Sequence, residues 1–169
     1  MPIQRLNHAV LYVRDVGRSV AFYTEALGFR VVMEMPGQAA FLQAADSTND
    51  HDLGLFAIGD RAGASTAGRS TVGLYHLAWE VDTLAELQRI RDVLTERGAL
   101  VGASDHGSTK ALYAHDPDGI EFEVSWLVPA ALLDPDEKVS TRPLHLEREI
   151  EHYGADTRGG VGVSVPAVR

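Results

Sequence analysis

The stretch Tyr113-Ala-His-Asp-Pro-Asp-Gly-Ile-Glu-Phe-Glu-Val-Ser-Trp126 predicts two strands joined by a tight turn. Within Asp116–Gly119, the proline presets φ for the corner and the glycine adopts a backbone conformation that other residues resist. Apolar runs lie on both sides of this turn, so the stretch is typical of a hairpin.

Alternation in the second strand of this hairpin separates apolar from acidic side chains. Ile120, Phe122 and Val124 share one face, and Glu121 and Glu123 share the other. A carboxylate in the middle of a strand costs free energy if it is buried without a charge partner. A metal cation would be such a partner, so Glu123 is a candidate metal ligand.

A pattern of one strand, one helix and three strands occurs twice along the chain. Leu6–Val13 and Leu74–Val81 are each rich in β-forming residues, and each precedes a segment with helical spacing of apolar residues. His76 stands 68 positions after His8, at the matching point of the second copy. The sequence therefore predicts an internal repeat with copies of about 60 to 70 residues.

The predicted fold class is α+β, with paired βαβββ modules in a single domain over residues 1–127. The modules occupy about residues 4–58 and 73–127, and the Gly-, Ala-, Ser- and Thr-rich segment 59–72 is a flexible connector.

Residues 128–169 differ in character and are predicted to form a C-terminal arm and tail. Prolines interrupt 129–143, Leu144 to Tyr153 is compatible with one short helix, and 154–169 is expected to be a loose tail. The arm and the open edges of the modules together predict a homodimer.

The composition excludes several classes of function. The formal net charge of -9 and the pI near 5.1 argue against nucleic acid or an anionic membrane as a partner. The absence of cysteine excludes disulfides, thiolate nucleophiles and zinc–thiolate sites. No apolar stretch approaches about 20 residues, and the expectation is a soluble cytoplasmic protein.

His8, His76 and Glu123 together form a candidate metal-binding set. Two imidazoles and one carboxylate leave three coordination positions open, which suits non-haem Fe²⁺ because O2 and a chelating substrate can bind together. The alternative is that both histidines are ordinary core or edge residues. The repeat symmetry favours the metal, and both interpretations stay open on pattern alone.

Three motifs in the first copy resemble a known family: Asn7-His8-Ala9-Val10, Arg18-Ser19-Val20-Ala21-Phe22-Tyr23 and Leu27-Gly28-Phe29. They look like the opening of vicinal-oxygen-chelate proteins, which include glyoxalases, bleomycin-resistance proteins and extradiol ring-cleaving dioxygenases. The resemblance covers roughly residues 4–127. It implies a cup-shaped mixed β-sheet around a metal, with ligands at the positions of His8, His76 and Glu123.

A second group of motifs resembles the catechol-dioxygenase branch: Asp105-His106-Gly107-Ser108, Leu112-Tyr113 and His51-Asp52-Leu53-Gly54-Leu55. The resemblance implies that Tyr113, ten residues before Glu123, hydrogen-bonds the bound catecholate. It also implies that His106, with Tyr113, positions the substrate and stabilises charge on its oxygens, and that His51 is the acid–base residue. The alternatives are that His51 is a solvated histidine at a strand start and that Tyr113 is an ordinary strand aromatic.

The function that the resemblance implies is an extradiol dioxygenase that uses Fe²⁺, or Mn²⁺, to cleave a catechol-like aromatic with O2. One alternative is a glyoxalase-like lyase or isomerase with Zn²⁺ or Ni²⁺ and a fourth protein ligand. The other is a non-catalytic protein that binds an aromatic compound and confers resistance. The segment Leu53–Ile58 contains no acidic residue that would supply a fourth ligand, and this favours the dioxygenase.

Overall fold

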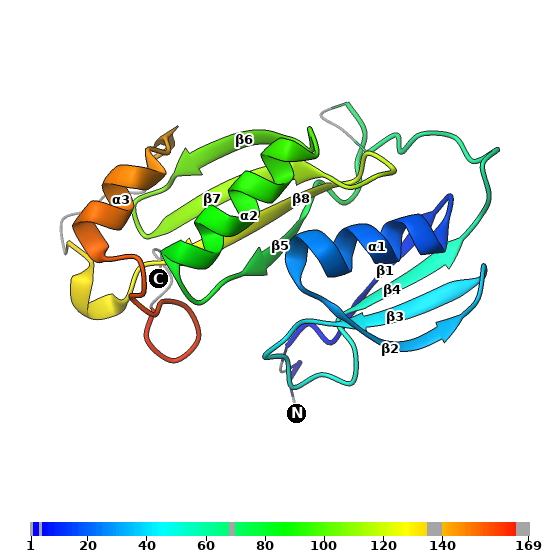
Figure 1. Ribbon diagram of the computed structural model, residues 1–169, viewed down its shortest axis with the longest axis horizontal. Helices are drawn as coiled ribbons and strands as arrows, with labels where there is room; N and C mark the ends of the chain where they lie inside the picture. The colour runs from blue at the N-terminus through cyan, green and yellow to red at the C-terminus, as the bar shows by residue number, and fades with distance from the viewer. Residues whose placement is uncertain (1, 4, 68–69, 135–139, 165–169) are drawn as a thin grey trace. The chain divides into compact units, whose positions relative to one another are not determined.

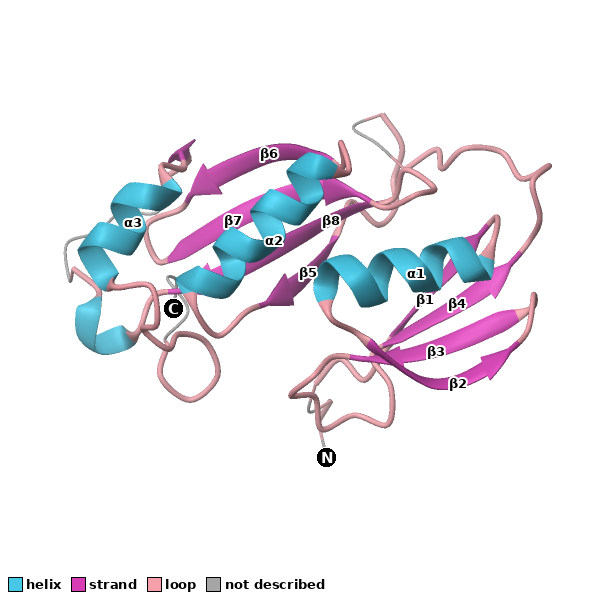
Figure 2. Cartoon of the chain, viewed as in Figure 1, coloured by secondary structure: helices cyan, strands magenta, loops and turns pink. Residues whose placement is uncertain are grey.

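The computed structural model describes residues 2–3, 5–67, 70–134 and 140–164, which form two compact units (Figures 1 and 2). The first unit comprises Met1–Thr66 with Asp116–Gly119, and the second comprises Ala67–His115 with Ile120–Arg169. The predictions for residues 68–69 of the connector, 135–139 of the arm and 165–169 of the tail lie outside the described residues.

The first unit is a four-stranded mixed sheet with one helix. Its elements in chain order are β1 (Ala9–Val13), α1 (Val16–Leu27), β2 (Arg30–Met35), β3 (Ala39–Gln43) and β4 (Leu53–Ala57). The strand order is β1-β4-β3-β2. β1 and β4 are parallel, whereas β3 is antiparallel to both of its neighbours.

The second unit repeats this topology. Its elements are β5 (Leu77–Glu80), α2 (Leu84–Glu96), β6 (Leu100–Asp105), β7 (Thr109–His115) and β8 (Glu121–Leu127). The strand order is β5-β8-β7-β6, again with a parallel first pair, and β9 from the arm is added beside β6. The predicted α+β class and the internal βαβββ repeat are confirmed.

Local sequence signals account for the helix boundaries. The Asp15 side chain accepts a hydrogen bond from the Arg18 backbone N–H at 2.8 Å, and Gly28 ends α1 in the left-handed region at φ 73°. Thr83 caps α2 by accepting from the Glu86 backbone N–H at 3.2 Å. Asp15, Gly28 and Thr83 are residue types that favour these helix ends.

Each helix lies across one face of its own sheet and buries an apolar stripe there (Figures 1 and 2). The stripe of α2 consists of Leu84, Leu87, Ile90 and Leu94, all buried. Burying such a side chain contributes about 1.5–3 kcal/mol. Because the helix occupies one face, polar side chains on the other face of the strands can form a site.

The arm contains a short 3₁₀ helix, η1 (Ala130–Leu132), then β9 (Arg142–Pro143) and α3 (Leu146–Tyr153). The predicted helix is therefore present, and β9 is an addition that the sequence does not predict. β9 pairs with β6, with Asp105 opposite Arg142.

The expectation of a loose tail is wrong for residues 154–164. The Gly159 backbone N–H donates to the Asp82 carbonyl at 2.8 Å, and Gly160 donates to the Leu127 carbonyl at 3.2 Å. A Cβ atom added at Gly159 would lie 2.0 Å from the Leu127 carbonyl oxygen, so only glycine fits this approach. The glycine- and valine-rich composition of the segment predicted a loose tail. Hydrogen bonds between backbone atoms do not depend on side-chain type, so the sequence could not reveal them.

The turn at Asp116–Gly119 forms as predicted, with Gly119 at φ 82° and its N–H bonded to the Asp116 carbonyl at 3.0 Å. The Asp118 side chain is 6% exposed and accepts hydrogen bonds from Arg14 at 2.8 Å and Arg18 at 2.7 Å. This ion-pair cluster belongs to the first unit.

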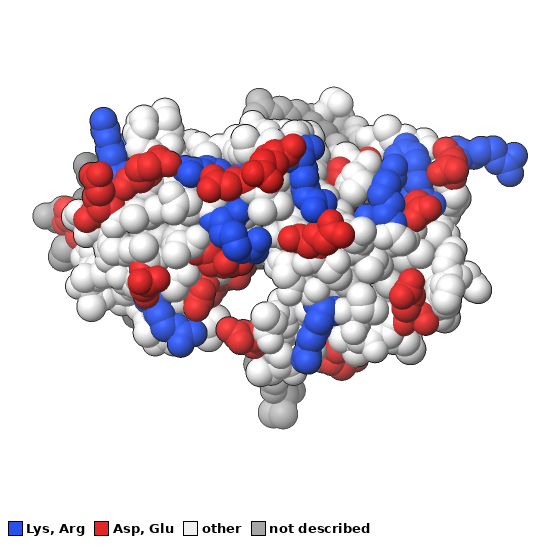
Figure 3. Space-filling view, viewed as in Figure 1, with Lys and Arg blue, Asp and Glu red and all other residues white. Residues whose placement is uncertain are grey.

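Acidic and basic side chains are interspersed on the face shown in Figure 3. No helix among the described residues is long and apolar enough to cross a bilayer.

Candidate metal and ligand site

His76 and Glu123 come together at the parallel pair of strands β5 and β8. His76 directly precedes β5, and Glu123 lies in the middle of β8 opposite Ala78. The Nε2 atom of His76 lies 3.4 Å from the Glu123 carboxylate oxygen Oε2. Glu123 occupies the polar face of β8, because its neighbours Phe122 and Val124 are buried on the apolar face.

The second ring nitrogen of His76 has unfilled hydrogen-bonding capacity. Its Nδ1 atom is buried and has no hydrogen-bond partner among the described residues, and the Glu121 carboxylate oxygen Oε1 lies 3.9 Å away. Histidines that bind a metal usually donate their other N–H to a carboxylate, a carbonyl or a water. Glu121 is therefore the carboxylate nearest to this second ring nitrogen of His76. This role of Glu121 was not predicted from the sequence, although strand alternation places it on the same face of β8 as Glu123.

Tyr113 lies next to Glu123 across the β7–β8 ladder. Its hydroxyl oxygen is 3.0 Å from Nε2 of His106. Burial, together with the adjacent Glu123 carboxylate, raises the pKa of Tyr113 to about 12. The phenol therefore keeps its proton at neutral pH. His76, Glu123, Tyr113 and His106 form one polar cluster in the second unit.

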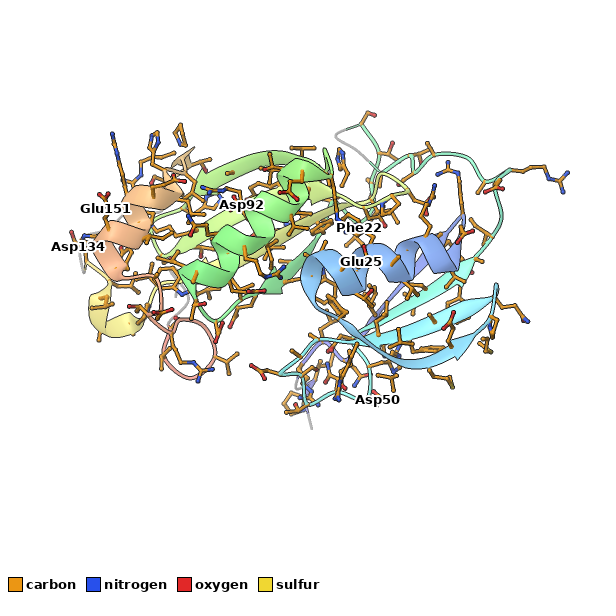
Figure 4. All side chains as sticks on the ribbon, viewed as in Figure 1. Phe22, Glu25, Asp50, Asp92, Asp134 and Glu151 are labelled. Atoms are coloured by element: carbon orange, nitrogen blue, oxygen red, sulfur yellow. The ribbon has the colours of Figure 1, made fainter. Side chains whose placement is uncertain are left out.

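His8 and His51 form a pair in the first unit. His8 directly precedes β1 and His51 lies two residues before β4, and these strands are parallel neighbours. The two imidazole rings are 4.4 Å apart between centroids, and the Phe41 ring lies edge-on to His51 at 5.1 Å. A backbone hydrogen bond from His51 lowers the pKa of Asp50, which Figure 4 labels on the loop before β4.

The prediction that both candidate histidine ligands lie within strands is wrong by one residue in each case. The β1 ladder begins with Ala9 opposite Leu53, and the β5 ladder begins with Leu77 opposite Phe122. Strand-forming neighbours favoured longer strands, whereas the observed strands begin one residue later, where backbone pairing begins. His8 and His76 occupy equivalent positions just outside their ladders.

The three proposed ligands are divided between the units, with His8 in the first and His76 and Glu123 in the second. Among the residues that the structure describes, His, Asp and Glu side chains form no cluster of three or more that could hold a metal. The second unit does bring two of the proposed ligands into contact, and the first unit brings His51 against the third.

The register of the two units also identifies the counterpart of Glu123 in the first unit. Glu123 pairs with Ala78, two residues after His76, whereas two residues after His8 the partner of Val10 is Gly54. The position that carries a carboxylate in the second unit therefore has no side chain in the first.

The family model for the Glyoxalase/Bleomycin resistance protein/Dioxygenase superfamily matches residues 5–124. Because this match spans most of the chain, the protein belongs to that superfamily. Its members bind divalent metal ions and small-molecule substrates.

The relatives include enzymes that are named for two different reactions. The chain is 28% identical over 158 residues to a catechol-2,3-dioxygenase of Bacillus subtilis, covering 90% of this chain and 53% of the relative. It is 30% identical over 138 residues to a lactoylglutathione lyase of Salmonella typhimurium, covering 71% of this chain and 90% of that protein. The chain thus spans about half the length of the dioxygenase relative.

A solved structure supports the fold. A glyoxylase/bleomycin resistance protein/dioxygenase domain from Frankia matches with a TM-score of 0.64 and 22% identity, covering 76% of this chain and 96% of that chain. At this identity the similarity defines the architecture and not the reaction.

Proposed function

We propose that the protein is an extradiol ring-cleaving dioxygenase that uses Fe²⁺ to insert both atoms of O2 into a catechol-like aromatic. The proposed ligands are His8, His76 and Glu123. The observation that carries this proposal is the contact between His76 and Glu123 at 3.4 Å, with the Tyr113 hydroxyl hydrogen-bonded to the same carboxylate. The dioxygenase relative supports the choice of reaction.

The separation of His76 and Glu123 fits two ligands of one divalent metal ion. Two ligand atoms with bond lengths of about 2.0–2.2 Å that meet a metal at a right angle lie roughly 3 Å apart. The His76–Glu123 separation of 3.4 Å is close to this value. When bound, the metal would supply the positive charge that favours ionised catechol oxygens and a coordination position for O2.

Each of the other polar residues has a defined task in this proposal. Tyr113, neutral at physiological pH, orients the substrate through a hydrogen bond to its oxygen, and His106 holds the Tyr113 hydroxyl in place. His51 removes a proton from the substrate and later returns one. Its contact with His8 supports this task, because the base then lies next to a proposed ligand.

Gly54 supports a centre with three protein ligands. A glyoxalase-like enzyme with Zn²⁺ or Ni²⁺ requires a fourth ligand, and the symmetric counterpart of Glu123 has no donor atom. A Cβ atom at Gly54 would lie 3.4 Å from a Val10 methyl carbon and 3.6 Å from the Phe56 ring. Apolar side chains therefore surround the position where a fourth carboxylate would stand.

The lyase remains the second candidate because the chain covers 90% of the lactoylglutathione lyase at 30% identity. The two functions separate in one experiment on protein purified without oxygen. One sample is loaded with Fe²⁺ and assayed for O2 uptake on a panel of catechols, and another is loaded with Zn²⁺ or Ni²⁺ and assayed for formation of lactoylglutathione. Catechol-dependent O2 uptake supports the dioxygenase, whereas lactoylglutathione formation without O2 uptake replaces it with the lyase.

We also propose that the protein assembles as a homodimer. Strand β2 lies at the edge of its sheet and exposes Val31, Val32, Met33 and Met35. An apolar edge strand of this kind readily pairs with a second chain.

A further inference from the structure

His106 forms hydrogen bonds through both ring nitrogens, each to a different part of the second unit. Its Nε2 lies 3.0 Å from the hydroxyl oxygen of Tyr113 on β7. Its Nδ1 lies 3.1 Å from the backbone carbonyl oxygen of Ser140 and 3.3 Å from the Thr141 hydroxyl, both in the C-terminal arm. The His106 backbone N–H donates to the Thr109 carbonyl at 2.9 Å, so the main chain at this position is also held.

The Ser140 carbonyl determines which nitrogen carries hydrogen. A carbonyl oxygen only accepts hydrogen bonds, so the contact at 3.1 Å requires a hydrogen on Nδ1. With the opposite tautomer, the lone pair of Nδ1 would face the lone pairs of this oxygen. The Thr141 hydroxyl can accept from the same N–H or rotate away, so it does not oppose this arrangement.

The state of Nε2 then controls the direction of the Tyr113 hydroxyl. In neutral His106 the hydrogen is on Nδ1, so Nε2 accepts and the Tyr113 O–H donates to it. In protonated His106, Nε2 donates to the Tyr113 oxygen, and the hydroxyl turns its hydrogen toward another acceptor such as Glu123. Nδ1 carries hydrogen in both states.

We propose that the Ser140 carbonyl keeps the hydrogen of the neutral His106 ring on Nδ1, so that Nε2 is the nitrogen that accepts the hydrogen bond of the Tyr113 hydroxyl. The arm is therefore a positioning element for the Tyr113 hydroxyl. It acts through His106 and supplies a backbone atom rather than a side chain.

A buried ion network holds the arm segment that contains Ser140. Arg142, two residues later, pairs with Asp105 across β9 and β6 and contacts its carboxylate at 3.0 Å. Lys110, with a side chain 3% exposed, contacts Asp105 at 2.6 Å and Glu149 of α3 at 3.0 Å. A lysine paired with two carboxylates away from water fixes the arm against β6 and β7.

This inference deepens the proposed function, and its importance for ring cleavage rests on that function. The position of the hydrogen itself is measured in protein without metal or substrate. A negative dioxygenase assay would therefore not change the tautomer result, and a negative tautomer result would not change the dioxygenase assay.

The test is a long-range ¹H–¹⁵N correlation spectrum of the full chain labelled with ¹⁵N. The spectrum is recorded about two pH units above the ordinary histidine pKa of about 6.5, where imidazole is neutral. The chain has 7 histidines, so the His106 signals are assigned by their absence in His106→Gln. We expect a protonated, pyrrole-type shift for Nδ1 and an unprotonated, pyridine-type shift for Nε2. The reverse assignment overturns the proposal.

The role of the arm is tested with a charge reversal and a matched control on α3. Glu149→Arg places a cation next to Lys110 and undocks the arm, whereas Glu151→Arg makes the same charge change at an exposed position of the same helix (Figure 4). We expect mixed tautomers in Glu149→Arg and the wild-type spectrum in Glu151→Arg. Arg142→Ala replaces Glu149→Arg if circular dichroism shows that the latter does not fold. An unchanged Nδ1–H tautomer in the undocked arm would show that Ser140 does not control it.

Discussion

His51 packs its ring against His8 and Phe41 at the start of β4, in the unit that supplies one of the proposed metal ligands. Imidazole takes up and returns protons near neutral pH, which is what ring cleavage requires of an acid–base residue. The arrangement supports a direct part for His51 in the reaction, separate from metal binding.

We expect that His51→Phe retains the metal and binds catechol but cleaves the ring at least about a hundredfold more slowly, the usual scale of general acid–base catalysis. Metal content, catechol affinity and turnover are measured on the same preparation. The control is His145→Phe at an exposed position. Full activity of His51→Phe would make His51 a bystander, and loss of metal would identify it as a fourth ligand in favour of the lyase.

Asp118 stabilises the first unit through its ion pairs. Burial by itself would raise the pKa of Asp118, but hydrogen bonds from Arg14 and Arg18 outweigh burial and lower it. A carboxylate with a lowered pKa in the folded state contributes stability above its unfolded pKa of about 3.9 and loses it as the pH falls through the folded value.

We expect that Asp118→Asn lowers the free energy of unfolding by about 1–3 kcal/mol at pH 7, the usual cost of losing a charged hydrogen-bond partner. The difference from wild type should shrink as the pH falls from about 4 through the lowered folded pKa, because the wild-type carboxyl becomes protonated first in the unfolded and then in the folded protein. Urea denaturation at several pH values measures this, with the exposed Asp46→Asn as control. A difference that does not change with pH would exclude the ion pairs as its cause.

Lys110 on β7 connects the sheet of the second unit to helix α3 of the arm. Its ammonium group is buried between Asp105 and Glu149, and it lies 5.6 Å from the centre of the Tyr153 ring. Removing one member of a buried ion cluster leaves its partners without a counter-charge.

We expect that Lys110→Ala lowers the free energy of unfolding by about 3–5 kcal/mol, the usual cost of leaving buried charges unpaired. The control is Arg89→Ala, which removes an exposed pair with Glu86 and should cost about 1 kcal/mol or less. Thermal and denaturant unfolding report both values. Equal effects of the two substitutions would contradict a buried role for Lys110.

The elements that the sequence predicts correctly are those with local signals. The hairpin turn before Gly119 and the alternation around Glu123 each depend on residues within a few positions of one another. The β9 pairing and the ordered residues 154–164 depend instead on backbone contacts with distant segments. Such contacts leave no composition or periodicity to detect.

The candidate site also contains some features that the sequence could predict and others that it could not. The family resemblance implied that His76 and Glu123 share a metal, and the second unit brings these two side chains into contact. It also implied that Tyr113 and His106 are site residues, but it did not predict the hydrogen bond between them. The Ser140 carbonyl next to His106 was not predictable, because a backbone oxygen carries no residue-type signal. Only the strand register shows that Gly54 is the position equivalent to Glu123 and that it has no carboxylate.

Assembly is a property of the whole molecule, and the exposed apolar strand β2 is the surface proposed to support it. We expect a sedimentation-equilibrium mass near twice the chain mass of 18.3 kDa at micromolar concentration. Val32→Lys together with Met33→Lys should shift the protein to the monomer, because charges on an edge strand oppose pairing. A wild-type mass equal to that of one chain would contradict the dimer.

The central proposal is that His8, His76 and Glu123 bind one metal ion. The most direct test is elemental analysis of protein purified without oxygen, as wild type and as His8→Ala, His76→Ala and Glu123→Ala. The exposed histidine variant His145→Ala is the control, and circular dichroism verifies folding. We predict one metal ion per chain in wild type and control, and loss of stoichiometric metal in each of the three variants. Unchanged metal content in all three would contradict the proposed metal centre.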